Sequence, residues 1–176
     1  PFSMIKQKKQ RLTEKEIHGI EKDRITGKSG QSIMKEEIVM TGIIDKIRNI
    51  SGLGKARGCS LEQIEEAQKT LGITFPEEFI EYVKEFGCID FGATEWTGLN
   101  IKGYLNTVTA TQREISANHN FPKDSFVLED MNIDAKKVIV DESGKVSMLQ
   151  YDKITPLCNS ISEYLDCLLY TSDAAD

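Results

Sequence analysis

The chain has 176 residues, of which 39% are hydrophobic, and its 28 Asp and Glu against 22 Lys and Arg give a net charge of −6. No apolar stretch approaches the length of a membrane span, so we expect none. An acidic protein is repelled by nucleic acid and by phospholipid headgroups. We therefore predict neither a nucleic-acid partner nor a membrane partner.

The cysteines are widely scattered at Cys59, Cys88, Cys158 and Cys167. That spacing predicts reduced thiols rather than a disulfide or zinc framework. No charged-then-apolar segment follows Pro1 or Met40, so no signal peptide is predicted. We expect a cytoplasmic protein, and nothing in the sequence calls for a cofactor.

Charge and composition divide the chain into three parts. Residues 1–39 carry 9 Lys and Arg against 6 Asp and Glu, whereas residues 40–166 carry 13 against 20, which is a net charge of −7. Our hypothesis is that translation begins at Met40, because a ribosome-binding sequence could encode residues 35–37. The alternative is that residues 1–39 form a disordered or partly helical arm.

The last part, residues 167–176, resembles the translation of a sequencing-transposon adapter. The alternative is a genuine, frayed C-terminus. On the first interpretation, residues 40–166 are one domain with its own core, truncated at its C-terminal end.

Helices are predicted first along this domain. Isoleucines with helical spacing predict a helix over 41–50, which the glycines of 51–54 end. Ser60 and Gln63 form a capping box for a helix over 61–71, and Gly72 suits the left-handed position after it. Pro76 suits the first position of a third helix. This helix is expected to bury Phe79, Tyr82, Val83 and Phe86.

Strand patterns follow the helices. Residues 88–91 and 95–99 are predicted as strands with a turn at Gly92, and a short helix is predicted over 107–117. Three further antiparallel strands are predicted at 126–128, 137–140 and 146–151, and a second capping box at Ser160 and Glu163 opens a terminal helix. The order predicts an α+β fold: a twisted antiparallel sheet with N-terminal helices and a C-terminal helix packed on it.

Catalytic and metal-binding patterns are incomplete. Residues 130–134 begin like a calcium-binding loop, but Ala135 stands where glycine is required and Asp141 where a bidentate glutamate is required. His119 is the only histidine of residues 40–166, so no histidine-based metal cluster or acid–base pair can form within them. Residues 27–29 lack the first glycine of a phosphate-binding loop. We therefore predict that the protein is not an enzyme and binds no metal.

Carboxylates at strand ends and turns are the better candidates for function, since loops on a rigid sheet present contacts to a partner. Trp96 lies among them and has two interpretations, a core residue or an interface anchor. From charge and placement we predict one acidic face that would occlude a basic cleft of a protein partner and speed association. Its residues are Asp90, Glu95, Trp96, Asp130, Asp134, Asp141 and Glu142.

A series of short motifs also runs through residues 60–166 in a fixed order. The series comprises Gly72-Ile73-x-Phe75-Pro76, Phe86-Gly87, Thr97-Gly98-Leu99, Asn120-Phe121-Pro122, Asp141-Glu142-Ser143-Gly144-Lys145 and Asn159-Ser160-x-x-Glu163-Tyr164-Leu165. It resembles the SUKH superfamily (SMI/KNR type), in particular its YobK-like immunity subgroup.

The resemblance implies the SUKH fold, with the motif residues in structural roles. It also implies a non-catalytic, bacterial immunity protein, which binds and neutralises the C-terminal domain of a polymorphic or LXG-type toxin, often a nuclease. We expect such a protein to act as a monomer. The alternative is a regulatory or scaffold module, as in the fungal branch of the superfamily, which would bind host proteins without a neighbouring toxin gene.

Overall fold

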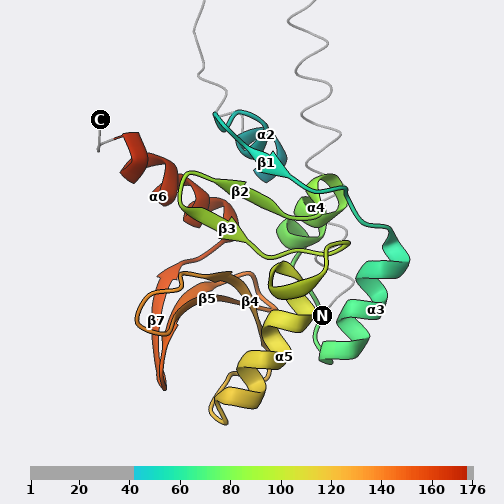
Figure 1. Ribbon diagram of the computed structural model, residues 1–176, viewed down its shortest axis with the longest axis vertical. Helices are drawn as coiled ribbons and strands as arrows, with labels where there is room; N and C mark the ends of the chain where they lie inside the picture. Colours follow the sequence, from blue (N-terminus) through green and yellow to red (C-terminus); the bar gives the residue numbers. More distant parts are fainter. Residues whose placement is uncertain (1–41, 174–176) are drawn as a thin grey trace, which may run out of the picture. The chain divides into compact units, whose positions relative to one another are not determined.

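The computed structural model describes residues 42–173 (Figure 1), so the interpretation of residues 1–39 lies outside the described residues. Helices precede and follow a sheet within this part of the chain. They are α2 (Ile43–Arg48), α3 (Leu61–Leu71), α4 (Glu77–Phe86), the 3-10 helix η1 (Gly103–Leu105), α5 (Thr107–Ala117) and α6 (Ile161–Asp173). Residues 167–173 belong to helix α6, and the interpretation of residues 167–176 as an adapter-encoded tail stays a prediction.

The sheet is a seven-stranded antiparallel meander, in which each strand pairs with the next one along the chain. Its strands are β1 (Gly54–Lys55), β2 (Ile89–Phe91), β3 (Thr94–Trp96), β4 (Ser125–Asp130), β5 (Lys136–Asp141), β6 (Val146–Gln150) and β7 (Lys153–Cys158). The predicted α+β class is confirmed. Strands β1 and β7 were not predicted from the sequence.

Local capping signals explain where the helices begin and end. The Ser60 hydroxyl accepts the Gln63 N–H, and the Gln63 side chain accepts the Ser60 N–H, which confirms the first capping box. Gly72 ends α3 in the left-handed conformation, with φ 71°. The prediction for Pro76 was wrong by one residue, because its extended ψ of 153° makes it the N-cap and α4 begins at Glu77.

Helix α6 is capped partly by another helix. Ser160 accepts the Glu163 N–H, but the Glu163 carboxylate accepts the Asn159 N–H, so the second predicted capping box is only half formed. The carboxylate of Glu78, on α4, accepts the N–H groups of Ile161 and Ser162 at 2.9 and 3.2 Å. This contact satisfies helix-terminal donors across 83 residues of sequence and joins α4 to α6.

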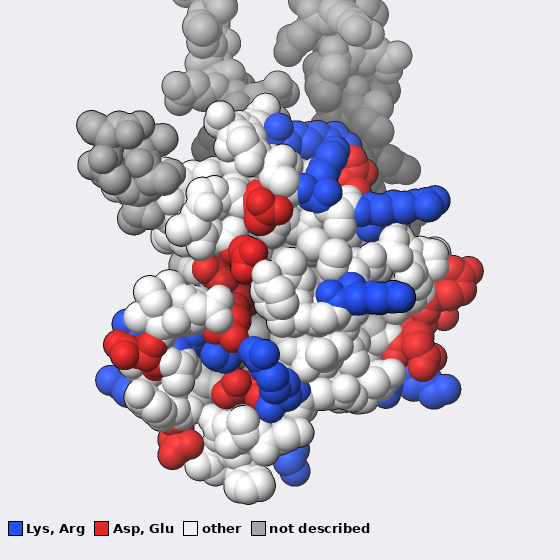
Figure 2. All heavy atoms as spheres, in the orientation of Figure 1, with Lys and Arg blue, Asp and Glu red and all other residues white. Residues whose placement is uncertain are grey.

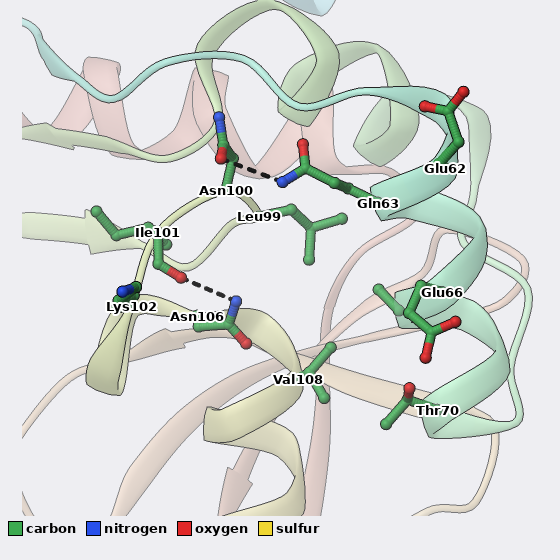
Figure 3. Close-up of a pocket in the computed structure, with 11 residues that line it drawn as sticks. Glu62, Gln63, Glu66, Thr70, Leu99, Asn100, Ile101, Lys102, Asn106 and Val108 are labelled. Atoms are coloured by element: carbon green, nitrogen blue, oxygen red, sulfur yellow. Dashed lines mark hydrogen bonds between the residues drawn. The ribbon is translucent and has the colours of Figure 1, made fainter.

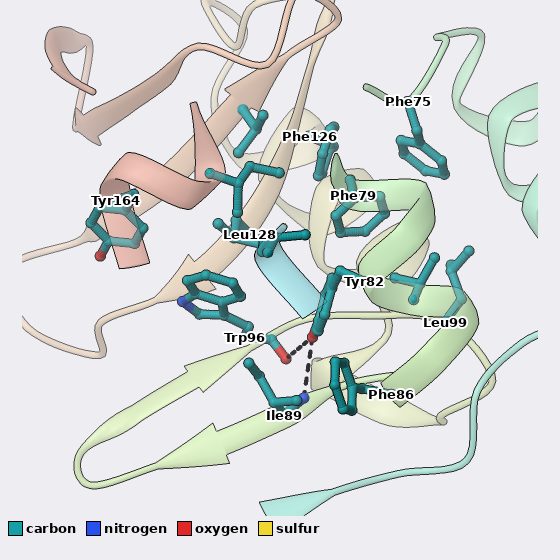
Figure 4. Packing of buried hydrophobic residues seen from close by; sticks show 14 of the residues in the cluster. Phe75, Phe79, Tyr82, Phe86, Ile89, Trp96, Leu99, Phe126, Leu128 and Tyr164 are labelled. Carbon is teal, nitrogen blue, oxygen red and sulfur yellow. Dashed lines mark hydrogen bonds between the residues drawn. The ribbon is translucent and has the colours of Figure 1, made fainter. Parts of the chain in front are cut away.

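The main core lies where α4 and α6 meet the sheet, and aromatic rings dominate it (Figure 4). Phe79 packs against Phe126 with ring centroids 4.5 Å apart, and Tyr82 meets Trp96 edge to face at 5.7 Å. The Tyr82 hydroxyl donates to the Thr97 carbonyl at 3.0 Å and accepts the Ile89 N–H at 3.1 Å. Tyr82 thereby fixes α4 to both strands of the β2–β3 hairpin.

The opposite face of β4–β6 packs on α5. Val127, Ile139 and Leu149 alternate with residues of the main core and form a smaller cluster with Ala110 and Phe121. Alternate side chains of a strand point to opposite faces, so these central strands are buried on both sides. Strand β7 is instead an exposed edge, and Pro156 is tolerated there because an edge strand can lose a donor.

Two glycines allow a close backbone approach beside the hairpin. A Cβ at Gly98 would lie 1.7 Å from the Gly87 carbonyl oxygen, and Gly87 has φ 72°. Leu99 donates its N–H to the same oxygen at 2.9 Å. The chain leaving β3 can therefore approach the chain leaving α4 only because Gly98 lacks a side chain, and a Cβ at Gly87 would meet the Arg57 carbonyl oxygen on the neighbouring segment.

One carboxyl group is buried in the core. Glu129 is 5% exposed, faces Trp96 across the β3–β4 pair, and accepts the Tyr164 hydroxyl at 2.9 Å. Burial raises the pKa of Glu129, and the hydrogen bond from Tyr164 and the nearby Trp96 indole oppose that rise only in part. The Trp96 ring also stacks on Tyr164 at 6.1 Å.

We expect Glu78→Ala to lower the free energy of unfolding by about 1–2 kcal/mol, because it leaves the α6 donors without their cap. Glu77→Ala is the matched control, since Glu77 is also in the first turn of α4 but is exposed. Both variants lose the same interaction with the α4 dipole. Urea unfolding that gave equal losses for the two variants would contradict the capping role.

We expect the stability of Glu129→Gln relative to the wild type to rise with pH. As pH passes the ordinary glutamate pKa of about 4.3, the unfolded wild-type chain releases its proton before the folded chain does, so the wild type loses stability. Asp130→Asn should show the opposite trend, because the pKa of Asp130 is lowered in the fold. Urea unfolding at a series of pH values on either side of the ordinary carboxyl pKa values measures the stability of both variants. If the difference in stability between Glu129→Gln and the wild type did not change with pH, the raised pKa of Glu129 would be refuted.

Candidate functional site

The seven residues predicted to form one acidic face are only partly brought together. Asp90, Glu95 and Trp96 belong to the β2–β3 hairpin. Asp130 follows Glu129, which pairs with Trp96 across β3 and β4, so Asp130 lies beside the hairpin, and Asp134 lies in the turn that follows β4. Asp141 and Glu142 lie at the other end of β5, about 13 Å from Lys137, the partner of Asp130, at roughly 3.3 Å per residue. The prediction of a single face formed by all seven residues therefore does not match the fold.

Asp90 and Glu95, the hairpin carboxylates, face each other directly across β2 and β3 on the outer side of the sheet. Neither forms an ion pair with any cation of residues 42–173. The Tyr104 hydroxyl donates to Glu95 at 3.3 Å, and the Glu95 charge raises the pKa of Tyr104. Two opposed like charges destabilise a strand pair, so a cation from a partner would relieve the repulsion.

Asp130 is already neutralised within the fold. Its carboxylate accepts from Arg113 at 2.9 Å and from Lys137 at 2.8 Å, and its side chain is 15% exposed. Burial alone would raise the pKa of Asp130, but the hydrogen bonds from Lys137 and the Asn132 amide and the two cationic charges lower it. Asp134 remains exposed, in a turn where Asn132, Asp134 and Ala135 all have positive φ.

Asp141 and Glu142 support loops. The Asp141 carboxylate accepts the Ser143 hydroxyl and the N–H groups of Ser143 and Lys145, which closes the β5–β6 turn. The Glu142 carboxylate accepts the Thr74 N–H at 2.7 Å and so holds the crossing between α3 and α4. These hydrogen bonds give both residues structural roles.

Trp96 was wrongly placed on the predicted face. Its side chain is fully buried, at 0% exposure, among Tyr82, Phe91 and Tyr164. The reason is strand alternation: Glu95 points outward, so its neighbour Trp96 points into the core. The interpretation of Trp96 as a core residue is the one that the fold supports.

Figure 2 shows acidic side chains at several places on this face. One region lies near β2 and β3 and a second lies over α3. Helix α3 carries Glu62, Glu65 and Glu66, all of which are exposed. The second region was not selected from the sequence, because acidic residues on a helix face usually only solvate it.

An open groove of about 560 Å³ lies beside these helical carboxylates (Figure 3). Helix α3 forms one wall with Glu62, Glu66 and Thr70, and the segment 100–106 forms the other. Its floor is apolar. Leu99 and Val108 lie at the floor, and Ala67 is a further apolar residue that lines the groove.

Asn100 holds the groove in shape. Its φ of 59° is in the left-handed region, which asparagine tolerates better than most residues. Its side-chain oxygen accepts from Gln63 at 3.1 Å, and its side-chain nitrogen donates to the carbonyls of Arg57 and Gly58. One side chain thus joins α3, the segment before it and the chain leaving β3.

Asn106 performs a similar task on the second wall. Its side-chain nitrogen donates to the Ile101 carbonyl at 3.0 Å, and its oxygen accepts the Thr109 N–H as the N-cap of α5. The amide side chains at the groove are therefore committed to its walls. Glu62, Glu66 and Lys102 form no ion pair among the described residues.

The described residues contain no group of three or more His, Cys, Asp or Glu side chains placed to hold a metal ion. Burial raises the pKa values of the Cys59 and Cys88 thiols. The two candidate surfaces, the hairpin carboxylates and the groove, are therefore defined by their charge and shape. Their geometry suits contact with another molecule.

We expect Asn100→Ala to lower the free energy of unfolding by about 1–2 kcal/mol, because it removes three hydrogen bonds and leaves a left-handed residue without them. Asn100→Gly should lower the free energy of unfolding by only about 0.5–1 kcal/mol, since glycine adopts positive φ without strain. Urea unfolding measures both variants. Equal stability of the two, or a less stable glycine variant, would show that backbone strain at this position is unimportant.

No helix of residues 42–173 combines the length and the apolar composition needed to cross a bilayer.

Comparisons with known proteins identify the family. None of the curated proteins matches the chain. A family model of the SUKH superfamily, described as SMI1-KNR4 cell-wall, matches residues 40–169, which is most of the chain. The chain therefore belongs to the SMI1-KNR4 family of SUKH domains.

Proposed function

We propose that the protein is an immunity protein of the YobK-like type, which binds the C-terminal domain of a cognate polymorphic or LXG-type toxin. The toxin domain in this proposal is a nuclease, and neutralisation occurs by occlusion, without catalysis. Membership of the SUKH superfamily supports the proposal, because its bacterial members are mostly immunity proteins. The protein acts as a monomer, in the cytoplasm where the toxin would do harm.

The observation that carries the proposal is the pair of hairpin carboxylates. Asp90 and Glu95 are held side by side on a rigid sheet, with no internal cation among the described residues to neutralise them. A nuclease needs a basic surface to hold the phosphates of its substrate. Opposed carboxylates are complementary to such a surface, and electrostatic steering would speed capture of the toxin.

Co-expression tests the function directly. The full chain and the toxin domain encoded by the neighbouring reading frame are expressed together in a bacterial host. We expect growth with the chain and killing without it. Killing in both cases, or the lack of any neighbouring toxin gene, would instead favour the regulatory or scaffold role.

Asp90→Lys combined with Glu95→Lys should weaken binding to the toxin domain by about tenfold or more at low salt, with the fold retained. The single change Asp90→Lys should also increase stability, because it replaces a like-charge pair by an opposite pair. Calorimetric titration measures the binding, and thermal unfolding measures the stability.

Glu77→Lys combined with Glu81→Lys is the control for net charge, because both residues are exposed on α4 and lie outside the hairpin. It should change the dissociation constant little. If the variant with Asp90→Lys and Glu95→Lys bound as tightly as the wild type at low salt, the hairpin carboxylates would not contact the toxin.

A further inference from the structure

We propose that the groove between α3 and segment 100–106 binds a Lys- or Arg-bearing segment of the partner protein. The long aliphatic stem of that side chain lies on the apolar floor, and its cationic head lies against Glu62 and Glu66. This inference adds a second contact surface and rests on the proposed function for the identity of the partner.

The shape of the groove supports a preformed binding site. Its volume of about 560 Å³ is within the range of about 300–1,000 Å³ that is usual for ligand pockets. Asn100 and Asn106 fix both walls through hydrogen bonds, so little conformational entropy would be lost on binding. The left-handed Asn100 is also strained backbone of the kind that persists at binding sites.

The floor and the rim together select the chemistry of the occupant. Leu99 and Ala67 are almost fully buried beneath the groove, and the half-buried Ile101 and Val108 supply most of the apolar surface that faces it. Glu62 and Glu66 are exposed one helical turn apart, so their carboxylates lie along the same wall. Lysine and arginine combine an apolar stem with a cationic head and so match both features.

Lys102 fixes the direction of binding. It lies on the wall opposite the carboxylates and would repel a cation placed near it. The cationic head must therefore lie along α3, and removal of the Lys102 charge should strengthen binding.

The first test uses N-acetyl-arginine amide, titrated into the ¹⁵N-labelled full chain and followed by amide chemical shifts. We expect the shifts to concentrate at residues that line the groove. N-acetyl-citrulline amide is the matched neutral probe and should bind about threefold to fivefold more weakly, as expected for one or two partly exposed ion pairs. Equal binding of the two probes, or shifts outside the groove, would overturn the proposal.

Variants assign the effect to the two walls. Glu62→Gln combined with Glu66→Gln should weaken binding of the arginine probe by about threefold to fivefold, whereas Lys102→Gln should strengthen its binding. Glu65→Gln is the control for the single changes Glu62→Gln and Glu66→Gln, because Glu65 is exposed on the same helix but does not line the groove. Thermal unfolding confirms that each variant remains folded. An equal effect of Glu65→Gln would refute the assignment to the groove.

The toxin domain provides the second test. Glu62→Lys combined with Glu66→Lys should weaken its binding by about tenfold or more, with Glu65→Lys close to the wild type. If the double variant bound the toxin as tightly as the wild type, the groove would not be a contact surface, and the proposed immunity function would be unaffected. If the wild type failed to bind any neighbouring toxin, the immunity function would fail, and the arginine probe would still decide whether the groove binds a cation.

Discussion

The buried hydroxyl of Tyr82 is the interaction on which the arrangement of the other elements depends. It donates to the Thr97 carbonyl and accepts the Ile89 N–H, so one atom from α4 fixes both strands of the β2–β3 hairpin. Buried backbone groups of a short hairpin need partners, and Tyr82 supplies one inside the core. The outward position of Asp90 and Glu95 follows from that fixed register, since Ile89 and Trp96 must then point inward.

The same region also shapes the groove. Gly87 and Gly98 bring the chain leaving α4 against the chain leaving β3, and the next residues, Leu99 and Asn100, form part of the floor and one wall. Both candidate surfaces therefore extend from one rigid junction. A surface that needs no rearrangement loses little entropy on binding, which favours the proposed capture of a partner.

Local signals in the sequence were sufficient to predict much of this fold. The capping box at Ser60, the glycine after α3 and the aromatic stripe of α4 all depend on residues close in sequence. The α+β class followed from the order of the predicted helices and strands. Strand β7 escaped prediction because an exposed edge strand that contains Pro156 lacks the alternation of a half-buried strand. Strand β1 has only two residues and is defined by its pairing with β2.

The candidate site was less predictable, because its parts meet only in three dimensions. Glu78 and Glu142 look like surface residues in the sequence, yet each accepts N–H groups from residues 68 or more positions away. Asp130 is neutralised by Arg113 from α5, a contact that no local pattern reveals. Likewise the groove combines α3 with a segment that begins almost 30 residues after that helix ends.

We propose that this protein neutralises its partner by stoichiometric contact through preformed surfaces. A nuclease assay with the purified toxin domain, titrated with the full chain, distinguishes such contact from catalysis. We expect loss of nuclease activity at an equimolar end point, an unchanged toxin mass, and recovery of activity once the complex is separated. Inhibition at far below equimolar amounts, with a change in toxin mass, would show that the protein acts as a catalyst and not by stoichiometric contact.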